Sequence, residues 1–220
     1  MRYFAALLGL GLLVPGTLAR GGPPPKPSVV PLSWELDFEY QPVQSITLRL
    51  PGEKRPRTFW YMLFTICNRS GADRLYVPGF DLYTDTGQVL GAGKDVPTVV
   101  FQAIKKRHNN PLLMSLTAMT GRILQGEDNA KDGVAIWRDF DPKARRFDIF
   151  IGGLSGERAK IKLPVPVVVV KKDENGKPVK VTQTELNLAK TLQLSYSLPG
   201  EAASRTKTRP RLLAKRWVMR

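Results

Sequence analysis

The chain has almost no cysteine or histidine: Cys67 and His108 are the only residues of these two types. A single cysteine excludes an intramolecular disulfide, and one cysteine with one histidine excludes the usual zinc sites built from these ligands. Cys67 stands in an apolar run, which predicts a small buried hydrophobe. His108 follows a basic cluster, Lys105–Arg107, so the sequence predicts a cationic or exposed histidine, which is a poor general base.

The chain also has few long apolar runs. Tyr3–Val14 is the first, and it follows the single positive charge of Arg2 and precedes a helix-breaking Pro15-Gly16 and the small residue Ala19. This three-part pattern predicts a secretory signal peptide over residues 1–19, because the apolar run is too short for a membrane span of roughly 20 residues. The later run from Val165 to Val170 contains a proline and stops at two lysines, so no transmembrane span is expected.

Acidic residues are outnumbered: 19 Asp and Glu stand against 34 Lys and Arg, for a net charge of +15. The last 21 residues alone carry seven basic residues and one acid. Such an excess favours anionic partners, although it also serves solubility. No nucleic-acid-binding module is present, so nucleic acid is not an expected partner.

Proline and glycine divide the chain. Residues 20–31 hold five prolines and two glycines, which predicts a linker, and residues 32–199 form the predicted folded domain. Leu32–Tyr40 alternates apolar and polar residues as a half-buried strand does, and Thr58–Cys67 is apolar on both faces, as a central strand is. The predicted core comprises Trp34, Leu36, Phe38, Phe59, Tyr61, Leu63 and Ile66.

Helical spacing of apolar residues appears only between 98 and 120, where we expect one or two short helices. Beyond it, short alternating segments return, and Asn175-Gly176 is a strong hairpin signal. The basic segment 200–220 ends in RLLAKRWVMR, whose apolar residues favour a final edge strand that docks Trp217. The alternative is a cationic anchor with Trp217 at a lipid interface.

Trp60–Gly87 reads WYMLFTICNRSGADRLYVPGFDLYTDTG, an apolar strand ending in Asn-x-Ser-Gly and a second strand ending in an Asp-x-x-Asp-x-Gly turn. This segment, with the strands GVAIW (133–137) and FDIFIGGLSG (147–156), resembles exported bacterial immunoglobulin-like β-sandwich domains that serve as accessory modules. The resemblance covers about half the chain. It implies an immunoglobulin-like β-sandwich, here with helices inserted near 98–120, and a non-catalytic role.

Asp85-Thr86-Gly87 matches the signature of aspartic proteases, in which two aspartates share one proton. Only one copy exists, so a protease would have to be a homodimer, and polar residues flank the motif where apolar ones would keep the site dry. A turn that uses Asp for a local hydrogen bond and Gly for a positive φ explains the motif better.

The remaining candidate sites are weaker. Glu127–Asp132 is predicted to be a solvated acidic loop, with calcium as an open alternative, although its spacing matches no standard calcium loop. Ser155 lacks the second glycine of a nucleophile elbow, because Glu157 stands in its place. Asn68-Arg69-Ser70 is a formal glycosylation sequon that we interpret as a turn.

The sequence therefore predicts a mainly β, non-catalytic protein, exported to the periplasm or the cell exterior, that binds or scaffolds at the envelope. We assign no catalytic, cofactor-binding or metal-binding residue and expect no cofactor. Its partner is an unidentified envelope or extracellular molecule, with an anionic polymer as one option. The alternatives are a dimeric aspartic-type protease that uses Asp85, and a cationic binder of anionic polymers that acts through the C-terminal segment.

Overall fold

A computed structural model describes residues 24–200 and 205–220. The predicted signal peptide, residues 1–19, and the first part of the predicted linker lie outside these residues. The described part of the linker, residues 24–31, contains no helix or strand. None of the helices in the described ranges has the length and apolar character that crossing a membrane requires.

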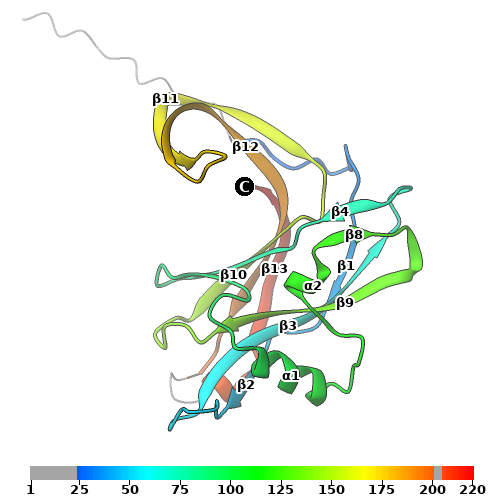
Figure 1. Cartoon of the computed structure of the whole chain (residues 1–220), viewed down its shortest axis with the longest axis vertical. Helices are drawn as coiled ribbons and strands as arrows, with labels where there is room; N and C mark the ends of the chain where they lie inside the picture. The colour runs from blue at the N-terminus through cyan, green and yellow to red at the C-terminus, as the bar shows by residue number, and fades with distance from the viewer. Residues whose placement is uncertain (1–23, 201–204) are drawn as a thin grey trace, which may run out of the picture. The chain divides into compact units, whose positions relative to one another are not determined.

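The protein is mainly β, as the sequence predicts, and Figure 1 shows how its strands and helices are arranged. One sheet of five strands is built on β3, the segment that is apolar on both faces. β3 pairs along one edge with β1 and β2 and along the other with β9, which also pairs with the short parallel strand β7. These strands are β1 (Asp37–Tyr40), β2 (Gln44–Leu48), β3 (Arg57–Asn68), β7 (Met114–Ser115) and β9 (Gly126–Arg138).

A second sheet has six strands in the order β11-β12-β10-β5-β6, with β13 also paired to β12. A separate two-stranded pair joins β4 (Arg74–Tyr76) to β8 (Gly121–Ile123), and a 3-10 turn, η1, covers Arg205–Lys207. The six strands are β5 (Gly79–Thr84), β6 (Val89–Gly91), β10 (Arg146–Gly152), β11 (Arg158–Lys172), β12 (Pro178–Ser197) and β13 (Arg211–Met219).

The main core lies where these two sheets face each other. Trp60, Met62 and Phe64 project from one face of β3, and apolar residues such as Ile149 of β10 and Leu194 of β12 meet them from the other sheet. β5 and β10 alternate buried and half-buried or exposed residues, so the second sheet buries one face against the first sheet. The facing layers therefore form a single cluster of fully buried side chains.

A second core cluster lies on the opposite face of β3. Phe59, Tyr61 and Leu63 pack there against Val100 and Ile104 of α1 (Thr98–Arg107). The expectation of one or two short helices between 98 and 120 is confirmed: the segment forms α1 and α2 (Leu116–Met119). The predicted core residues are therefore divided between two layers, because adjacent residues of one strand point to opposite faces.

Two sequence predictions of secondary structure were wrong. The strand expected over Leu32–Tyr40 is confined to Asp37–Tyr40, preceded by one bridge from Glu35 to Ser155, and Leu32 is 80% exposed. The acidic loop expected at Glu127–Asp132 belongs to strand β9. Lys131 and Asp132 are half-buried where this part of β9 pairs with the end of β3, so the low content of apolar residues was misleading.

The C-terminal segment forms β13, the strand that the sequence favoured. It runs antiparallel to β12, from the pair Lys190–Met219 to the pair Ser197–Arg211. Trp217 is half-buried against the main core. The lysine that interrupts the apolar side of this strand, Lys215, has its ammonium 5.5 Å from the centre of the Tyr40 ring, a cation–π contact.

The described chain separates into two compact units. We call residues 24–161, 187–200 and 205–220 the body. We call residues 162–186, the distal parts of β11 and β12 with their turn, the hairpin arm. The sequence placed this segment within the 32–199 domain, and each unit is described below by itself.

Candidate functional site: the hairpin arm

The hairpin arm is a two-stranded ribbon closed by the turn that Asn175-Gly176 predicts. The Asp173 carboxylate accepts hydrogen bonds from the backbone N–H groups of Asn175 and Lys177, at 2.9 and 2.8 Å. Gly176 has a φ of 77°, a left-handed conformation that glycine adopts without steric cost. The turn chemistry therefore fixes where β11 ends and β12 begins.

The arm exposes an unusual amount of aliphatic surface. Six of its valines are between 38% and 68% exposed. The four in β11 lie on both faces of that strand, since Val167 and Val168 are adjacent, and the other two lie in β12. The six are Val165, Val167, Val168, Val170, Val179 and Val181. A two-stranded ribbon is at best marginally stable in water, and contiguous exposed apolar surface marks interaction sites.

The two edges of the ribbon differ in what they offer a neighbouring strand. Pro164 and Pro166 lie inside β11 and cannot donate to a ladder, so their nitrogens are accommodated on the edge that faces away from β12. On the other edge, the described strand β13 pairs with β12 only from Lys190 onward, while β10 pairs with the opposite edge of the same β12 residues from Leu192 onward. Within the described chain, the β12 edge from Pro178 to Leu186 is therefore open, and it contains no proline after its first residue.

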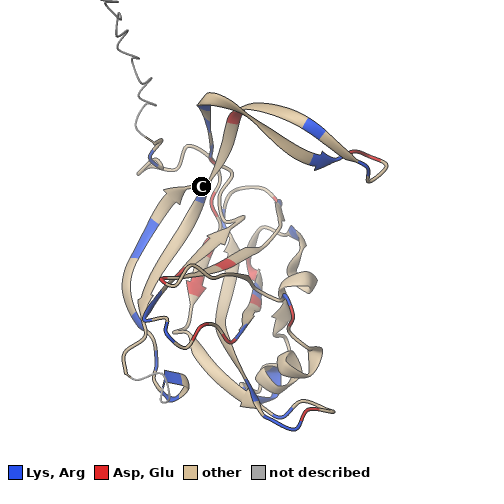
Figure 2. Cartoon of the chain, turned by 90° about the vertical axis from the view of Figure 1, so that its left-hand side faces the viewer, with Lys and Arg blue, Asp and Glu red and all other residues tan. Residues whose placement is uncertain are grey.

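The arm is weakly basic and has no aromatic side chain. It carries five lysines against three carboxylates, and Figure 2 shows the basic bands on its strands and the acidic residues at its turn. The lysines are Lys162, Lys171, Lys172, Lys177 and Lys180. Lipid-interface anchors use Trp, Phe and Leu, whereas β-branched residues suit a pleated sheet. The composition therefore favours a strand as the neighbour of this surface.

The body contains a buried ion cluster formed by Lys190 of β12, by Glu157, which directly precedes β11, and by Glu35. The Lys190 ammonium, only 2% exposed, lies 2.7 Å from Glu35 Oε1 and 3.2 Å from Glu157 Oε2. It also donates to the Ser28 carbonyl at 3.0 Å. The same ammonium lies 5.2 Å from the centre of the Trp217 ring, a cation–π contact. The cluster thus joins Ser28 of the predicted linker and Glu35, which follows the linker, to β12 and β13.

The pKa values in this cluster follow its contacts. The side chain and backbone N–H of Ser28 donate to the Glu157 carboxylate, at 2.6 and 3.0 Å, and lower the pKa of that group, with a further contribution from Lys190. Burial opposes the charged form of Lys190, but the hydrogen bonds and charges of Glu35 and Glu157 raise the pKa of its ammonium. Both groups are held in their ionised forms at neutral pH.

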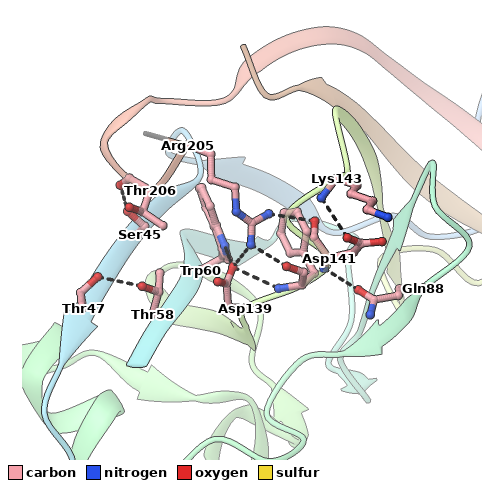
Figure 3. Close-up of polar contacts among 11 residues, drawn as sticks. Ser45, Thr47, Thr58, Trp60, Gln88, Asp139, Asp141, Lys143, Arg205 and Thr206 are labelled. Atoms are coloured by element: carbon pink, nitrogen blue, oxygen red, sulfur yellow. Dashed lines mark hydrogen bonds and ion pairs between the residues drawn. The ribbon is translucent and has the colours of Figure 1, made fainter. Parts of the chain in front are cut away.

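A second cationic cluster secures the chain ahead of β13 (Figure 3). Arg205 is buried, and its guanidinium donates to the Asp139 carboxylate and to the carbonyls of Phe140 and Asp141. The Trp60 indole N–H donates to the same Asp139 carboxylate at 2.8 Å. Because every contact satisfies a buried polar group or pairs a charge, this cluster stabilises the fold rather than presenting a site.

Asp85, the candidate protease aspartate, lies in an exposed turn between β5 and β6. Its carboxylate accepts hydrogen bonds from the backbone N–H groups of Arg145 at 3.2 Å and Arg146 at 3.0 Å. Gly87 has a φ of 86°, as the turn hypothesis requires. The carboxylate therefore links this turn to the segment that leads into β10.

The acidic residues around 127–132 do not converge. Glu127 pairs with Arg69, while Asp132 accepts hydrogen bonds from Thr65 at 2.7 Å and Asn110 at 2.8 Å. Across residues 24–200 and 205–220, no three Asp, Glu, His or Cys side chains lie close enough to hold a metal ion together.

The other single residues singled out in the sequence each have a structural environment of their own. His108 is half-buried at the end of α1 with its Nε2 2.9 Å from the Tyr61 hydroxyl, and burial, followed by the charge of Arg107, lowers its pKa. The prediction of a cationic or exposed histidine was therefore wrong. Cys67 is buried, as predicted, and Ser155 is buried with its hydroxyl accepting from the Glu157 N–H.

The Asn68 side chain is fully buried and supports a turn. Its amide donates to the carbonyls of Ala72 and Ile123, both at 2.9 Å, and its oxygen accepts from Ser70. The turn interpretation of the sequon is therefore confirmed, and the amide nitrogen is not accessible for glycosylation.

Comparison of this chain with family models, with curated proteins and with solved structures found no match.

Proposed function

We propose that this protein is an exported, non-catalytic binding or scaffolding protein of the cell envelope, built on an immunoglobulin-like β-sandwich, and that the hairpin arm is its binding element. The observation that carries the proposal is the combination of six exposed valines with an open strand edge on one short ribbon. The first 19 residues support export. The two facing sheets of the body support the sandwich.

The binding mode is strand addition. An extended segment of a partner protein pairs with the open edge of β12 and covers the valines on one face with its own alternating apolar side chains. Backbone hydrogen bonds supply affinity in this mode, and the side-chain pockets supply selectivity. The five lysines of the arm favour a partner segment that is flanked by acidic residues.

The two alternatives are less well supported by the geometry. A dimeric protease needs Asp85 in a dry pocket, whereas its carboxylate is exposed and bound to two backbone N–H groups. A cationic binder needs free basic residues on β13. On β13, Arg216 instead donates to Gln193 at 2.8 Å, and the Lys215 ammonium lies 5.5 Å from the centre of the Tyr40 ring. Arg220, which follows β13, lies 3.4 Å from the carboxylate of Asp81.

The test uses a defined peptide probe of alternating valine and threonine flanked by aspartates, with a lysine-flanked copy as its control. We expect the acidic peptide to bind the mature protein and to protect backbone amides of β12 between Val181 and Glu185 from hydrogen exchange. Changing Val179 and Val181, which share one face of β12, to threonine keeps the β-branched shape and should abolish binding. The matched control changes the exposed Val89 of the body to threonine.

Three outcomes contradict strand addition. Equal binding of both peptides would reject the charge argument, and binding without protection of the β12 amides would reject the edge. Concentration-dependent self-association that needs the arm valines would identify a second copy as the occupant instead. Export is tested separately: N-terminal sequencing of protein recovered outside the cytoplasm should begin at Arg20, and a chain that still begins at Met1 would refute it.

A further inference from the structure

A cavity of about 400 Å³ lies in the body, beside α1 and above β9. The loop before α1 and the N-terminal half of that helix form one wall, the segment Ser115–Thr117 forms the other, and Val134 and Ile136 of β9 form the floor. Small residues, Ala92 and Gly93, occupy the end of the cavity. The volume lies within the range of roughly 300–1,000 Å³ that is typical of small-molecule sites.

The chemistry of the lining divides by depth. Val134 and Ile136 are buried, and Phe101 adds a half-buried aromatic ring to the wall. The rim carries hydroxyl and amide groups from Thr98, Gln102 and Thr117, all of which are exposed. An apolar floor with a few polar groups at the mouth orients a ligand by its hydrogen bonds while the floor excludes water.

No ionisable side chain lines this cavity. The Lys105 ammonium lies 5.9 Å from the centre of the Phe101 ring but is not part of the lining. A charged ligand would therefore lose hydration there without a lining side chain of opposite charge, and that loss is costly. The absence of acids and bases in the lining also leaves no group that could transfer a proton to or from the ligand. The lining therefore favours uncharged ligands and a site that binds its ligand without catalysing a reaction.

The loop before α1, which lines the cavity, contains one residue with a strained backbone conformation. Asp95 adopts a φ of 57°, in the left-handed region, although it is not glycine. Such residues cost of order 1–3 kcal/mol and tend to cluster at ligand clamps. The strained residue lies between Gly93 and Val96, which both line the cavity.

We infer that this cavity binds a small uncharged molecule that presents one apolar face and several hydroxyl or amide groups. The ring of Phe101 contacts the apolar face, and the groups of Thr98, Gln102 and Thr117 bond to the polar edge. This site is independent of the hairpin arm, so either proposal stands if the other fails.

The probe is N-acetylglucosamine, which is uncharged and carries hydroxyls, an amide and an apolar ring face. Glucosamine and glucuronate provide cationic and anionic counterparts of similar size. Ligand-detected saturation-transfer NMR with the mature protein should show binding of the uncharged sugar and a weaker or absent signal for both ions. We expect Phe101→Leu to weaken binding several-fold, since stacking is lost while the apolar packing is kept.

Two further variants separate the site from general effects. Thr117→Tyr fills the mouth of the cavity from an exposed position and should abolish binding with the fold intact. Val99→Ala, on the same helix but outside the lining, should leave binding unchanged. Equal binding of the three sugars, no binding of the uncharged probe at millimolar concentration, or a Thr117→Tyr variant that still binds would each overturn the inference.

Discussion

Lys190→Met tests the buried ion cluster most directly, since methionine keeps the length of the side chain and removes only its charge and donors. In the folded protein, Lys190 faces two carboxylates, of which Glu157 is 9% and Glu35 is 24% exposed. Removing one partner of a buried pair leaves an uncompensated charge and typically costs about 3–5 kcal/mol. Because Glu35 retains some contact with water, we expect the lower end, about 3 kcal/mol.

The measurement is urea unfolding of the mature chain, followed by circular dichroism. With a slope of about 2–3 kcal/mol per molar urea, a loss of about 3 kcal/mol moves the midpoint down by about 1–1.5 M. Lys106→Met, at an exposed position of α1, is the matched control and should shift the free energy of unfolding by less than about 0.5 kcal/mol.

A triple variant distinguishes lost ion pairing from poor packing. Adding Glu35→Gln and Glu157→Gln to Lys190→Met removes the unpaired charges and should restore at least half of the lost stability. A single variant that unfolds at the wild-type midpoint would refute the cluster as described. A triple variant that is no more stable than the single one would assign the loss to packing instead.

Four further predictions concern single residues. Leu63→Ala should cost about 2–5 kcal/mol in urea unfolding, because Leu63 is 7% exposed in the core under α1, and an unmoved midpoint would reject that placement. Trp217→Ala should lower the melting temperature by several degrees while binding of anionic vesicles stays unchanged; the reverse result would favour the membrane anchor. Asp85→Asn should lower stability by about 1 kcal/mol and leave any activity of the protein intact, whereas acidic peptide hydrolysis that vanishes with this change would establish the protease. Because the pKa of Glu157 is lowered in the folded state, this group contributes stability that is present above its unfolded pKa and is lost as the pH falls through its folded pKa. Ser28→Ala removes a hydrogen bond that lowers this pKa and should therefore make stability fall less steeply with acid. An unchanged dependence of stability on acid pH would argue against this hydrogen bond.

Local patterns predicted those parts of the fold that local physics determines. β3 is apolar at every position that faces either core, so its central place was visible in the sequence. The same holds for α1, whose Val100 and Ile104 lie four residues apart, and for the Asn175-Gly176 turn. Each of these elements carries its structural information within a dozen residues.

The errors arise where contacts distant in sequence override composition. The strand around Asp132 is polar because its side chain bonds to Thr65 and Asn110, and neither partner is adjacent in the chain. His108 follows three basic residues, yet it packs beside Tyr61, 47 residues away. Lys190 is the only charged residue of β12 after Glu185, which was a usable signal. A lysine that is buried in a sheet needs a carboxylate partner, although the sequence does not say which one.

The arm and the cavity could be predicted to different degrees. The run Val165–Val170 between lysines and prolines is plain in the sequence, but a buried strand has the same appearance, and only the lack of a neighbouring described strand distinguishes them. The cavity gives no sequence signal at all, because its lining comes from segments up to 44 residues apart, Ala92 to Ile136, that share no motif.

The distribution of charge in the body supports a division of roles within the chain. Its two buried cations, Lys190 and Arg205, are both fully engaged with carboxylates and carbonyls, and they hold β12 and the approach to β13 in place. The hairpin arm, by contrast, keeps its valines exposed between solvated lysines. A chain under selection for stability alone gains nothing from six exposed valines on a marginally stable ribbon, since threonine would preserve the β preference without the apolar surface. The concentration of six exposed valines on one short ribbon is the physical reason to look for the partner of this protein at the arm rather than at Asp85 or at the C-terminus.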